Sequence, residues 1–417
     1  MNRYKIEGGN KLHGAVRVHG AKNAALPILA SCIINGRRSV IHNCPDLSDI
    51  QSTVEILTVL GCKVERCGTD VFVDSSQVKL CSIPEGIMNK TRSSTVFAGA
   101  LSSRCKRAYI AGSGGCQIGA RPIDIHLDAF KAMGMDVSCA GNAVILDAKN
   151  TKPSRIFLRF PSVGATENVM LAASGICGCT TIYNAAMEPE IVNLACYLRS
   201  IGVKISGDGT DVITIHGTKN FTDGEVTVIP DRIVASTYII AGLITGGEVL
   251  VTHVNPRHIS PIVAVLRKMG AVIKCCGNSV KVDKCTSLIN VPYIQTMPYP
   301  GFPTDAQPLI TALMAVSAGV GVVRENIFEN RLGHCIRLNS MGADISIKGK
   351  LACIKGVNQL YGAQVDACDL RSGASLCVAS LGAKGASYIS NVHYIDRGYE
   401  NICADLQSLG AEIERIE

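Results

Sequence analysis

Basic residues recur in segments whose residue types are typical of helix starts. These residues are Lys22, Arg92, Arg232 and Arg371. A helix start offers unpaired N–H groups and about half a positive charge, so a cation placed there opposes the helix dipole. Ser, Thr, Asp and Asn in the same segments are ordinary helix caps, but capping does not explain the cations. A bound anion would explain them, and the pattern therefore predicts a phosphate or carboxylate ligand.

A second group of charged residues lies in loops about a dozen positions before a recurring glycine. The residues at this place are Asp49, Arg121, Glu190, His258, Arg331 and Arg397. An arginine side chain presents a planar fork that suits carboxylate and phosphate groups. One such arginine is weak evidence, but basic residues at seven corresponding points predict a substrate with several negative charges. We expect this substrate to lie between two lobes.

The segment 112–124 combines several glycines with one cysteine and one arginine, and we expect it to form a mobile loop. Its glycines lack the spacing of a dinucleotide-binding motif, and no Gly-Lys-Ser/Thr follows them, which excludes a phosphate-binding P-loop. Cys116 lies in a polar, cation-flanked setting that favours reactivity over packing. Its thiol can donate a proton and its thiolate can attack an electrophile. The spacing indicates no Ser-His-Asp or Cys-His arrangement.

The composition argues against several other classes of function. The 19 cysteines include no Cys-x-x-Cys pair, so we expect no metal site, but free thiols, most of them buried as small apolar side chains. The net charge of +7 is scattered and tryptophan is absent, which argues against a nucleic-acid partner. No apolar run reaches the ~18 residues of a membrane span, and the N-terminus lacks an apolar signal segment. We therefore expect a cytoplasmic protein without membrane contact.

These residues are set in a sequence pattern that occurs six times. The pattern is a short helical segment that ends in glycine, followed by alternating polar and apolar residues. The glycines are Gly61, Gly134, Gly202, Gly270, Gly342 and Gly410, separated by 73, 68, 68, 72 and 68 residues. Such periods are too long for a solenoid and indicate a duplicated supersecondary unit. Each glycine is predicted to cap a helix in a left-handed conformation, ahead of a half-buried hairpin.

The full unit is predicted to contain a helix rich in small residues, a β-branched strand, a charged loop, an amphipathic helix and a hairpin. Only seven residues follow Gly410, too few for a hairpin, whereas residues 4–20 have the hairpin pattern. We therefore expect the N-terminus to close the sixth unit. The predicted fold is an α/β protein with two lobes of three units each. One lobe comprises residues 22–229, with the cysteine loop 112–121, and the other comprises residues 1–21 and 230–417.

Nine short motifs resemble those of one enzyme family. They are GAKNAALP at 20–27, GGCQIGARPID at 114–124, SVGATEN at 162–168, EPEIV at 188–192, PDRI at 230–233, FPTDAQ at 302–307, FENR at 328–331, DLR at 369–371 and DRGYE at 396–400. From end to end the chain resembles the UDP-N-acetylglucosamine 1-carboxyvinyltransferases, enolpyruvyl transferases of peptidoglycan synthesis. The resemblance implies two lobes, each an inside-out α/β barrel of three units. It also implies that phosphoenolpyruvate and the sugar 3-hydroxyl form a tetrahedral ketal that then loses phosphate, without a cofactor.

The resemblance assigns roles to individual residues. Cys116 would protonate the vinyl carbon, and Asp305 would contact and deprotonate the sugar hydroxyl, with Lys22 and Arg397 as further catalytic residues. The residues implied to bind or surround phosphoenolpyruvate are Lys22, Asn23, Arg92, Arg121, Arg331, Arg371 and Arg397. Those implied to contact UDP-N-acetylglucosamine are Asn23, Arg92, Arg121, Pro122, Ile123, Asp124, Ile125, Ser162, Val163, Gly164, Asp305 and Ile327.

Two alternatives stay open. A sister enolpyruvyl transferase acts on shikimate 3-phosphate and shares the fold, but the Cys116 loop and the EPE, FENR and DRGYE motifs argue against it. A catalytically silent regulatory paralogue would keep the glycines and apolar faces while losing the cations and Cys116. All of these are present.

Overall fold

The computed structural model describes residues 2–83, 95–111, 123–140, 143–285 and 287–417 of the chain. These residues form two compact units. The described residues of 20–229 make up one, called here the 20–229 unit, and those of 230–417 together with 2–19 make up the other, called the 230–417 unit. Each unit has a hydrophobic core of its own.

The repeated unit is seen in full in residues 155–217. It consists of β9 (Arg155–Phe157), α6 (Val163–Ser174), β10 (Gly178–Tyr183), α7 (Pro189–Ser200), β11 (Lys204–Ser206) and β12 (Val212–Gly217). The four strands form a sheet in the order β11-β12-β10-β9. Strand β9 is parallel to β10, and the other pairs are antiparallel. The second strand of the hairpin therefore lies in the sheet interior, beside β10.

The other elements in the described part of the 20–229 unit form two further sheets and four helices. The sheets have the orders β13-β3-β5-β4 and β6-β8-β7. The elements are α1 (Lys22–Ser31), β3 (Arg38–His42), α2 (Ser48–Val59), β4 (Lys63–Cys67), β5 (Asp70–Asp74), α4 (Phe97–Cys105), β6 (Arg107–Ala111), α5 (Asp124–Ala132), β7 (Asp136–Ala140), β8 (Ala143–Asp147) and β13 (Gly224–Thr227).

The 230–417 unit contains three four-stranded sheets, in the orders β15-β16-β14-β2, β17-β18-β20-β19 and β21-β22-β1-β23. Its elements are β1 (Arg3–Gly8), β2 (His13–Arg17), α8 (Arg232–Ile244), β14 (Glu248–Thr252), α9 (Ser260–Lys268), β15 (Ile273–Cys276), β16 (Ser279–Val282), β17 (Tyr293–Gln295), the 3-10 helix η2 (Thr304–Ala306), α10 (Gln307–Ala315), β18 (Val320–Arg324), α11 (Gly333–Ser340), β19 (Asp344–Lys348), β20 (Leu351–Lys355), β21 (Gln364–Asp366), α12 (Leu370–Gly382), β22 (Gly385–Ser390), the 3-10 helix η3 (Val392–Arg397), α13 (Ile402–Ser408) and β23 (Glu412–Ile416).

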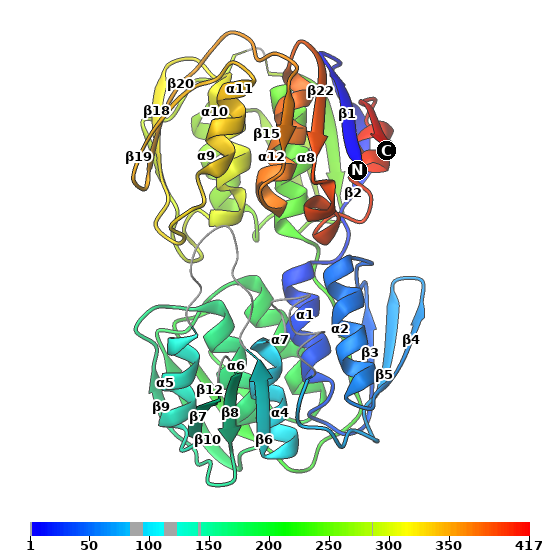
Figure 1. Cartoon of the computed structure of the whole chain (residues 1–417), viewed down its shortest axis with the longest axis vertical. Helices are drawn as coiled ribbons and strands as arrows, with labels where there is room; N and C mark the ends of the chain where they lie inside the picture. The colour runs from blue at the N-terminus through cyan, green and yellow to red at the C-terminus, as the bar shows by residue number, and fades with distance from the viewer. Residues whose placement is uncertain (1, 84–94, 112–122, 141–142, 286) are drawn as a thin grey trace. The chain divides into compact units, whose positions relative to one another are not determined.

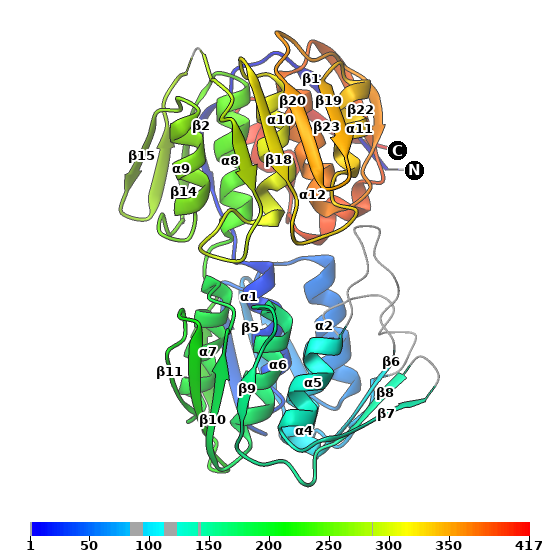
Figure 2. The same ribbon diagram turned by 90° about the vertical axis from the view of Figure 1, so that its left-hand side faces the viewer.

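In each unit, three helices rich in small and apolar residues lie at the centre, and the sheets lie around them. Nearly every residue of α8, α10 and α12 is buried, as expected for helices that are apolar on all faces. The strands surround these helices in both views of the molecule (Figure 1, Figure 2). This is the predicted α/β fold of six repeated units, three in each compact unit. Within the described ranges, no helix is long and apolar enough to cross a membrane.

The six repeated glycines end the outer helices as predicted. Each has a positive φ, between 82° and 102°. At Gly202, the glycine N–H donates to the Arg199 carbonyl and the Val203 N–H donates to the Leu198 carbonyl. This pair of bonds is the Schellman motif, and all six helix ends have it. The glycines thus set the angle at which each outer helix passes into its hairpin.

The prediction for the N-terminus was right about the first strand and wrong about the hairpin. Strand β1 lies between β22 and β23, antiparallel to both, and supplies the hairpin partner that the sixth unit lacks (Figure 1). Strand β2 does not pair with β1. It joins a different sheet, parallel to β14, in the place that β9 takes beside β10 in the unit 155–217, although β13 is the strand that precedes α8 in the chain. The alternating pattern identified two strands but not their partners.

The prediction that most cysteines are buried was wrong. Eight of the described cysteines are exposed and five are buried. Several exposed cysteines, including Cys67 in β4 and Cys276 in β15, lie on hairpin strands with a solvent-facing side. All described cysteines are free thiols, as expected.

Candidate active site

In the 230–417 unit, two arginines far apart in sequence bind the same carboxylate. Asp305 lies in η2, at the start of the inner helix α10. One of its oxygens is 2.9 Å from Nη2 of Arg331, in the loop before α11, and the other is 3.1 Å from Nη2 of Arg371, in the first turn of α12. The N-cap residue Asp369 accepts hydrogen bonds from the N–H groups of Arg371 and Ser372 and fixes this start of α12. Three predicted site residues therefore meet at adjacent helix starts.

The two guanidiniums are much less exposed than the carboxylate between them. Arg331 and Arg371 are 3% and 4% exposed, whereas the Asp305 side chain is 27% exposed. Burial lowers the pKa of Arg371, the Asp305 carboxylate raises it, and the net shift is upward from its ordinary value. Nε of Arg331 and Nη1 of Arg371 are buried and have no hydrogen-bond partner among the described residues. The cluster is thus cationic and holds two unused donors, both suited to an anion.

The segment that follows β18 carries Ile327. The N–H groups of Ile327 and Phe328 donate to Oε1 of Glu325, at 2.8 and 3.1 Å. The guanidinium carbon of Arg331 lies 5.6 Å from the centre of the Phe328 ring. Ile327 is therefore fixed in a turn that leads directly to the Asp305 cluster.

Arg397 is the last residue of η3, which packs against α12. Its neighbours in the DRGYE motif tie η3 to the rest of the unit. Asp396 accepts hydrogen bonds from Arg415 at 3.1 and 2.8 Å, and the Tyr399 hydroxyl lies 2.7 Å from that of Thr237 in α8. The motif thus holds the half-buried Arg397 on the helix that carries Arg371.

In the 20–229 unit, Lys22 has an internal partner. Its Nζ lies 2.9 Å from Oδ2 of Asp49, in the first turn of α2, and both side chains are at least nine-tenths buried. A bound anion is therefore not required to explain the cation at the start of α1, nor the one at Arg371. The sequence indicated Lys22 and Asp49 as charged residues at repeated places, but not that they pair with each other. Asn23 follows Lys22 and is half-buried.

The starts of α5 and α6 lie next to each other in the same unit. Nδ1 of His126 in α5 is 2.9 Å from Nδ2 of Asn168 in α6, and a Cβ at Gly164 would lie 3.0 Å from the His126 ring. Ser162 caps α6 by accepting a hydrogen bond from Ala165 N–H at 3.3 Å. This contact brings together six of the nine described residues that were predicted to bind the nucleotide sugar, Ile123, Asp124, Ile125, Ser162, Val163 and Gly164. Asp124 is ion-paired with Arg159.

Four predicted site residues lie outside the described residues. They are Arg92, Cys116, Arg121 and Pro122.

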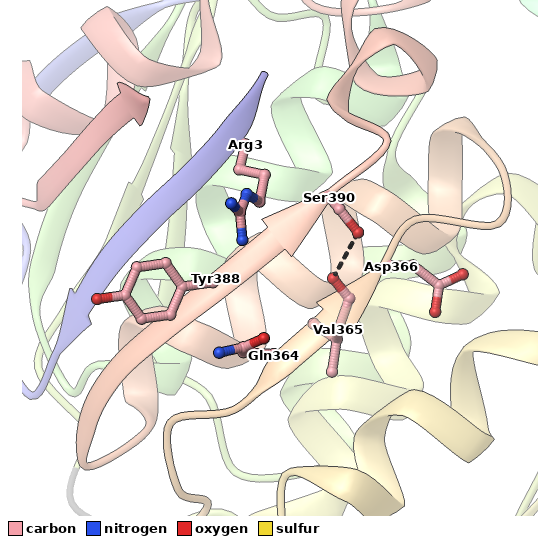
Figure 3. A pocket seen from close by; sticks show the side chains of 6 residues that line it. All are labelled: Arg3, Gln364, Val365, Asp366, Tyr388 and Ser390. Atoms are coloured by element: carbon pink, nitrogen blue, oxygen red, sulfur yellow. Dashed lines mark hydrogen bonds between the residues drawn. The ribbon is translucent and has the colours of Figure 1, made fainter. Parts of the chain in front are cut away.

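Within the described part of the chain, no group of three or more His, Cys, Asp or Glu residues is placed to hold a metal ion. A small pocket of about 200 Å³ lies on the sheet that contains β21, β22 and β1 (Figure 3). Its lining residues are Arg3, Gln364, Val365, Asp366, Tyr388 and Ser390. None of them is a predicted site residue, and the pocket is separate from the Asp305 cluster.

Three residues that were not predicted as site residues hold the site in place. Asp49 pairs with Lys22, Glu325 orders the turn at Ile327, and Asn168 joins three helices. Asn168 accepts a hydrogen bond from Gly99 N–H in α4 at 2.7 Å and contacts His126 in α5. The only indication of Asn168 in the sequence was that it is the last residue of the SVGATEN motif. Pairs such as Lys22 and Asp49 leave no signal in a single sequence.

Comparison with known proteins agrees with this geometry. The family model of EPSP synthase (3-phosphoshikimate 1-carboxyvinyltransferase) matches residues 6–406. UDP-N-acetylglucosamine 1-carboxyvinyltransferase 2 from Caldanaerobacter subterraneus subsp. tengcongensis is 45% identical over 416 residues, and the match covers 100% of both chains.

Two solved structures share the fold. The enolpyruvyl transferase NikO from Streptomyces tendae is similar with a TM-score of 0.89 and 26% identity, covering 99% of this chain and 98% of that one. EPSP synthase from Acinetobacter baumannii has a TM-score of 0.78 and 17% identity over 100% of both chains, a likeness of fold alone. The predicted fold class is confirmed. The chain belongs to the enolpyruvyl transferase family, and within it to the UDP-N-acetylglucosamine 1-carboxyvinyltransferases.

Proposed function

We propose that this chain transfers the enolpyruvyl group of phosphoenolpyruvate to the 3-hydroxyl of UDP-N-acetylglucosamine and releases phosphate. This is the first committed step of peptidoglycan synthesis. The full-length identity to UDP-N-acetylglucosamine 1-carboxyvinyltransferase 2 supports the choice of substrates. The enzyme acts in the cytoplasm, and no metal or cofactor takes part in the proposed reaction.

The chemistry is an addition followed by an elimination. The sugar oxygen attacks C2 of phosphoenolpyruvate, its proton leaves to a base, and C3 takes up a proton from an acid. The resulting ketal loses its phosphate from C2 and a proton from C3, which restores the double bond. The enzyme must therefore supply one base, one acid and cations for the substrate's phosphate and carboxylate.

The Asp305 cluster supports these roles most directly. Its carboxylate is partly exposed and lies between two guanidiniums, and a carboxylate in this place can accept the hydroxyl proton. The buried N–H donors that Arg331 and Arg371 leave unused are suited to the oxygens of an anionic substrate. Arg397 and Lys22 are assigned to phosphoenolpyruvate, together with Asn23, Arg92 and Arg121. Cys116 is assigned the protonation of C3.

The nucleotide sugar is assigned to the adjoining starts of α5 and α6 and to Ile327. Helix starts present N–H groups that suit a diphosphate, and Ser162 caps α6 while leaving the N–H groups of Val163 and Gly164 at its open end.

A phosphate-release assay tests the proposal. The chain should release phosphate from phosphoenolpyruvate with UDP-N-acetylglucosamine and not with shikimate 3-phosphate, the acceptor suggested by the name of the matching family model. Cys116→Ser should nearly abolish turnover, whereas Cys116→Asp, which keeps an acid, should retain part of it. Release with shikimate 3-phosphate alone, or with neither acceptor, would refute the assignment.

A further inference from the structure

Glu325 is a buried carboxylate that accepts four hydrogen bonds. It follows β18 and is 1% exposed. Its Oε1 accepts from the Thr296 hydroxyl at 2.9 Å and from the N–H groups of Ile327 and Phe328 at 2.8 and 3.1 Å. Its Oε2 accepts from the Thr304 hydroxyl at 3.0 Å. Both oxygens are therefore used, and by donors from three different segments.

The two oxygens serve segments on opposite sides of Asp305. Thr304 directly precedes Asp305 in η2. The turn at Ile327 and Phe328 continues into the loop that carries Arg331, whose guanidinium binds Asp305 at 2.9 Å. One side chain thus links the backbone that presents the carboxylate to the backbone that presents its counterion.

The Thr304 contact is not needed to form the turn. The turn is held by the two N–H bonds to Glu325 and also by Thr296, whose hydroxyl accepts the Asn326 N–H at 2.8 Å. Thr296 is fully buried after β17 and anchors the turn to the sheet. The Oε2 bond to Thr304 instead joins the turn to the segment that carries Asp305.

We propose that Glu325 is a positioning residue for Asp305. It sets the place of Thr304, and through it the Asp305 carboxylate, relative to the turn that carries Ile327 and leads to Arg331. This inference rests on the proposed function, in which Asp305 is the base for the sugar hydroxyl. Because a misplacement of about 1 Å can cost on the order of 10²-fold in rate, a single hydrogen bond at this point matters for turnover.

Thr304→Val removes the link while keeping the shape of the side chain and the turn. We expect kcat to fall roughly 10- to 100-fold, with KM for UDP-N-acetylglucosamine changed by less than about twofold because Ile327 stays in place. In an Asp305→Asn background, Thr304→Val should cause no further loss, since both changes act on the same group. A full additional loss in the double variant would overturn the proposal.

The matched control is Thr311→Val in α10. Thr311 is fully buried and its hydroxyl donates to the Gln307 carbonyl at 2.9 Å, away from Glu325. This variant should lower stability while leaving kcat within about twofold of the wild type. Glu325→Gln, whose amide can keep a carbonyl on the turn and an NH2 group on Thr304, should retain far more activity than Glu325→Ala. Equal losses of kcat in Thr304→Val and Thr311→Val would overturn the proposal.

A crystal structure of Thr304→Val separates this inference from the proposed function. Displacement of the Asp305 carboxylate from Arg331 or Arg371 supports positioning by Glu325 whatever the acceptor substrate is. An unchanged Asp305 overturns it, even if the wild-type chain releases phosphate with UDP-N-acetylglucosamine.

Discussion

Asp305 shares its two oxygens between two buried guanidiniums, and this arrangement couples stability to catalysis. Removing one partner of a buried ion pair leaves an uncompensated charge, which costs more than the pair itself contributes. Here the removed partner would be the base, and two arginines would lose their internal counterion. The unliganded protein therefore depends on Asp305 for the cations to stay close together. Lys22 and Asp49 form a similar buried pair in the other unit.

Asp305→Asn separates these two contributions. We expect kcat to fall about 10²- to 10⁴-fold because the base is lost. We also expect the free energy of unfolding to fall by roughly 3 kcal/mol, since two buried guanidiniums lose their counterion. Added inorganic phosphate should restore part of the thermal stability by binding between the arginines. Urea unfolding and thermal melts with and without phosphate measure both effects.

Asp366→Asn is the matched control for Asp305→Asn. Asp366 pairs with Arg337 in the same unit, but its side chain is 48% exposed. An exposed pair contributes about 0–1 kcal/mol, so this variant should keep its activity and most of its stability, with no added response to phosphate. An equal response to phosphate in the two variants would contradict the role of the Asp305 cluster.

At the scale of helices and strands, the sequence predicted the features that depend on neighbouring residues and missed those that depend on residues far apart in the chain. The outer helices and their glycine caps follow from a few neighbouring residues, and all six were predicted correctly. The short strands before the inner helices, such as β9 and β17, were missed because three residues show no period. The pairing of β2 with β14 was missed because strand partners are a long-range property. The role of Glu325 was not predicted for the same reason, because its four hydrogen-bond donors come from three segments that are separate in the sequence.

Helix α11 contains a histidine that makes the stability of its unit depend on pH. His334 is fully buried beside Arg331, with Nδ1 3.1 Å from the Arg331 carbonyl. Burial lowers the pKa of His334 to about 4, although Asp369 and the Arg331 carbonyl act in the opposite direction. The unfolded chain, with a histidine pKa near 6.5, then binds the proton first as the pH falls. Stability from this group is complete above pH ~6.5 and is lost as the pH falls toward 4.

His334→Asn should remove this part of the pH dependence. Between pH ~6.5 and 4, the wild type should lose on the order of 3 kcal/mol more unfolding free energy than the variant. His13→Asn, at an exposed position in β2 of the same unit, should leave the slope unchanged. Urea unfolding at several pH values measures it, and equal slopes in the wild type and His334→Asn would contradict the assignment.

At the scale of the whole molecule, the 230–417 unit is built from two separate segments of the chain, residues 2–19 and residues 230–417. Strand β1 contributes Ile6, which is fully buried, and Tyr4, which is 3% exposed, to the core of that unit. It lies in the interior of its sheet, and its Arg3 pairs with Ile416 of β23, so the two ends of the chain are strand neighbours (Figure 1). In the chain, the 20–229 unit is inserted between β2 and α8, which both belong to the 230–417 unit. A separate core in each unit supports the proposal that each is a folding domain.

A rearranged chain tests this organisation. Joining Glu417 to Met1 through one glycine leaves four residues between the paired Ile416 and Arg3, which is enough for a hairpin turn. We expect residues 230–417 followed by this joint and residues 1–19 to fold cooperatively on their own, and residues 20–229 to do the same. The fragment 230–417 alone should not, because β22 and β23 lose the strand between them and β14 loses its parallel neighbour β2. Circular dichroism and urea unfolding distinguish these fragments, and a fragment 230–417 that unfolds as cooperatively as the joined chain would show that the N-terminal strands are dispensable to the domain.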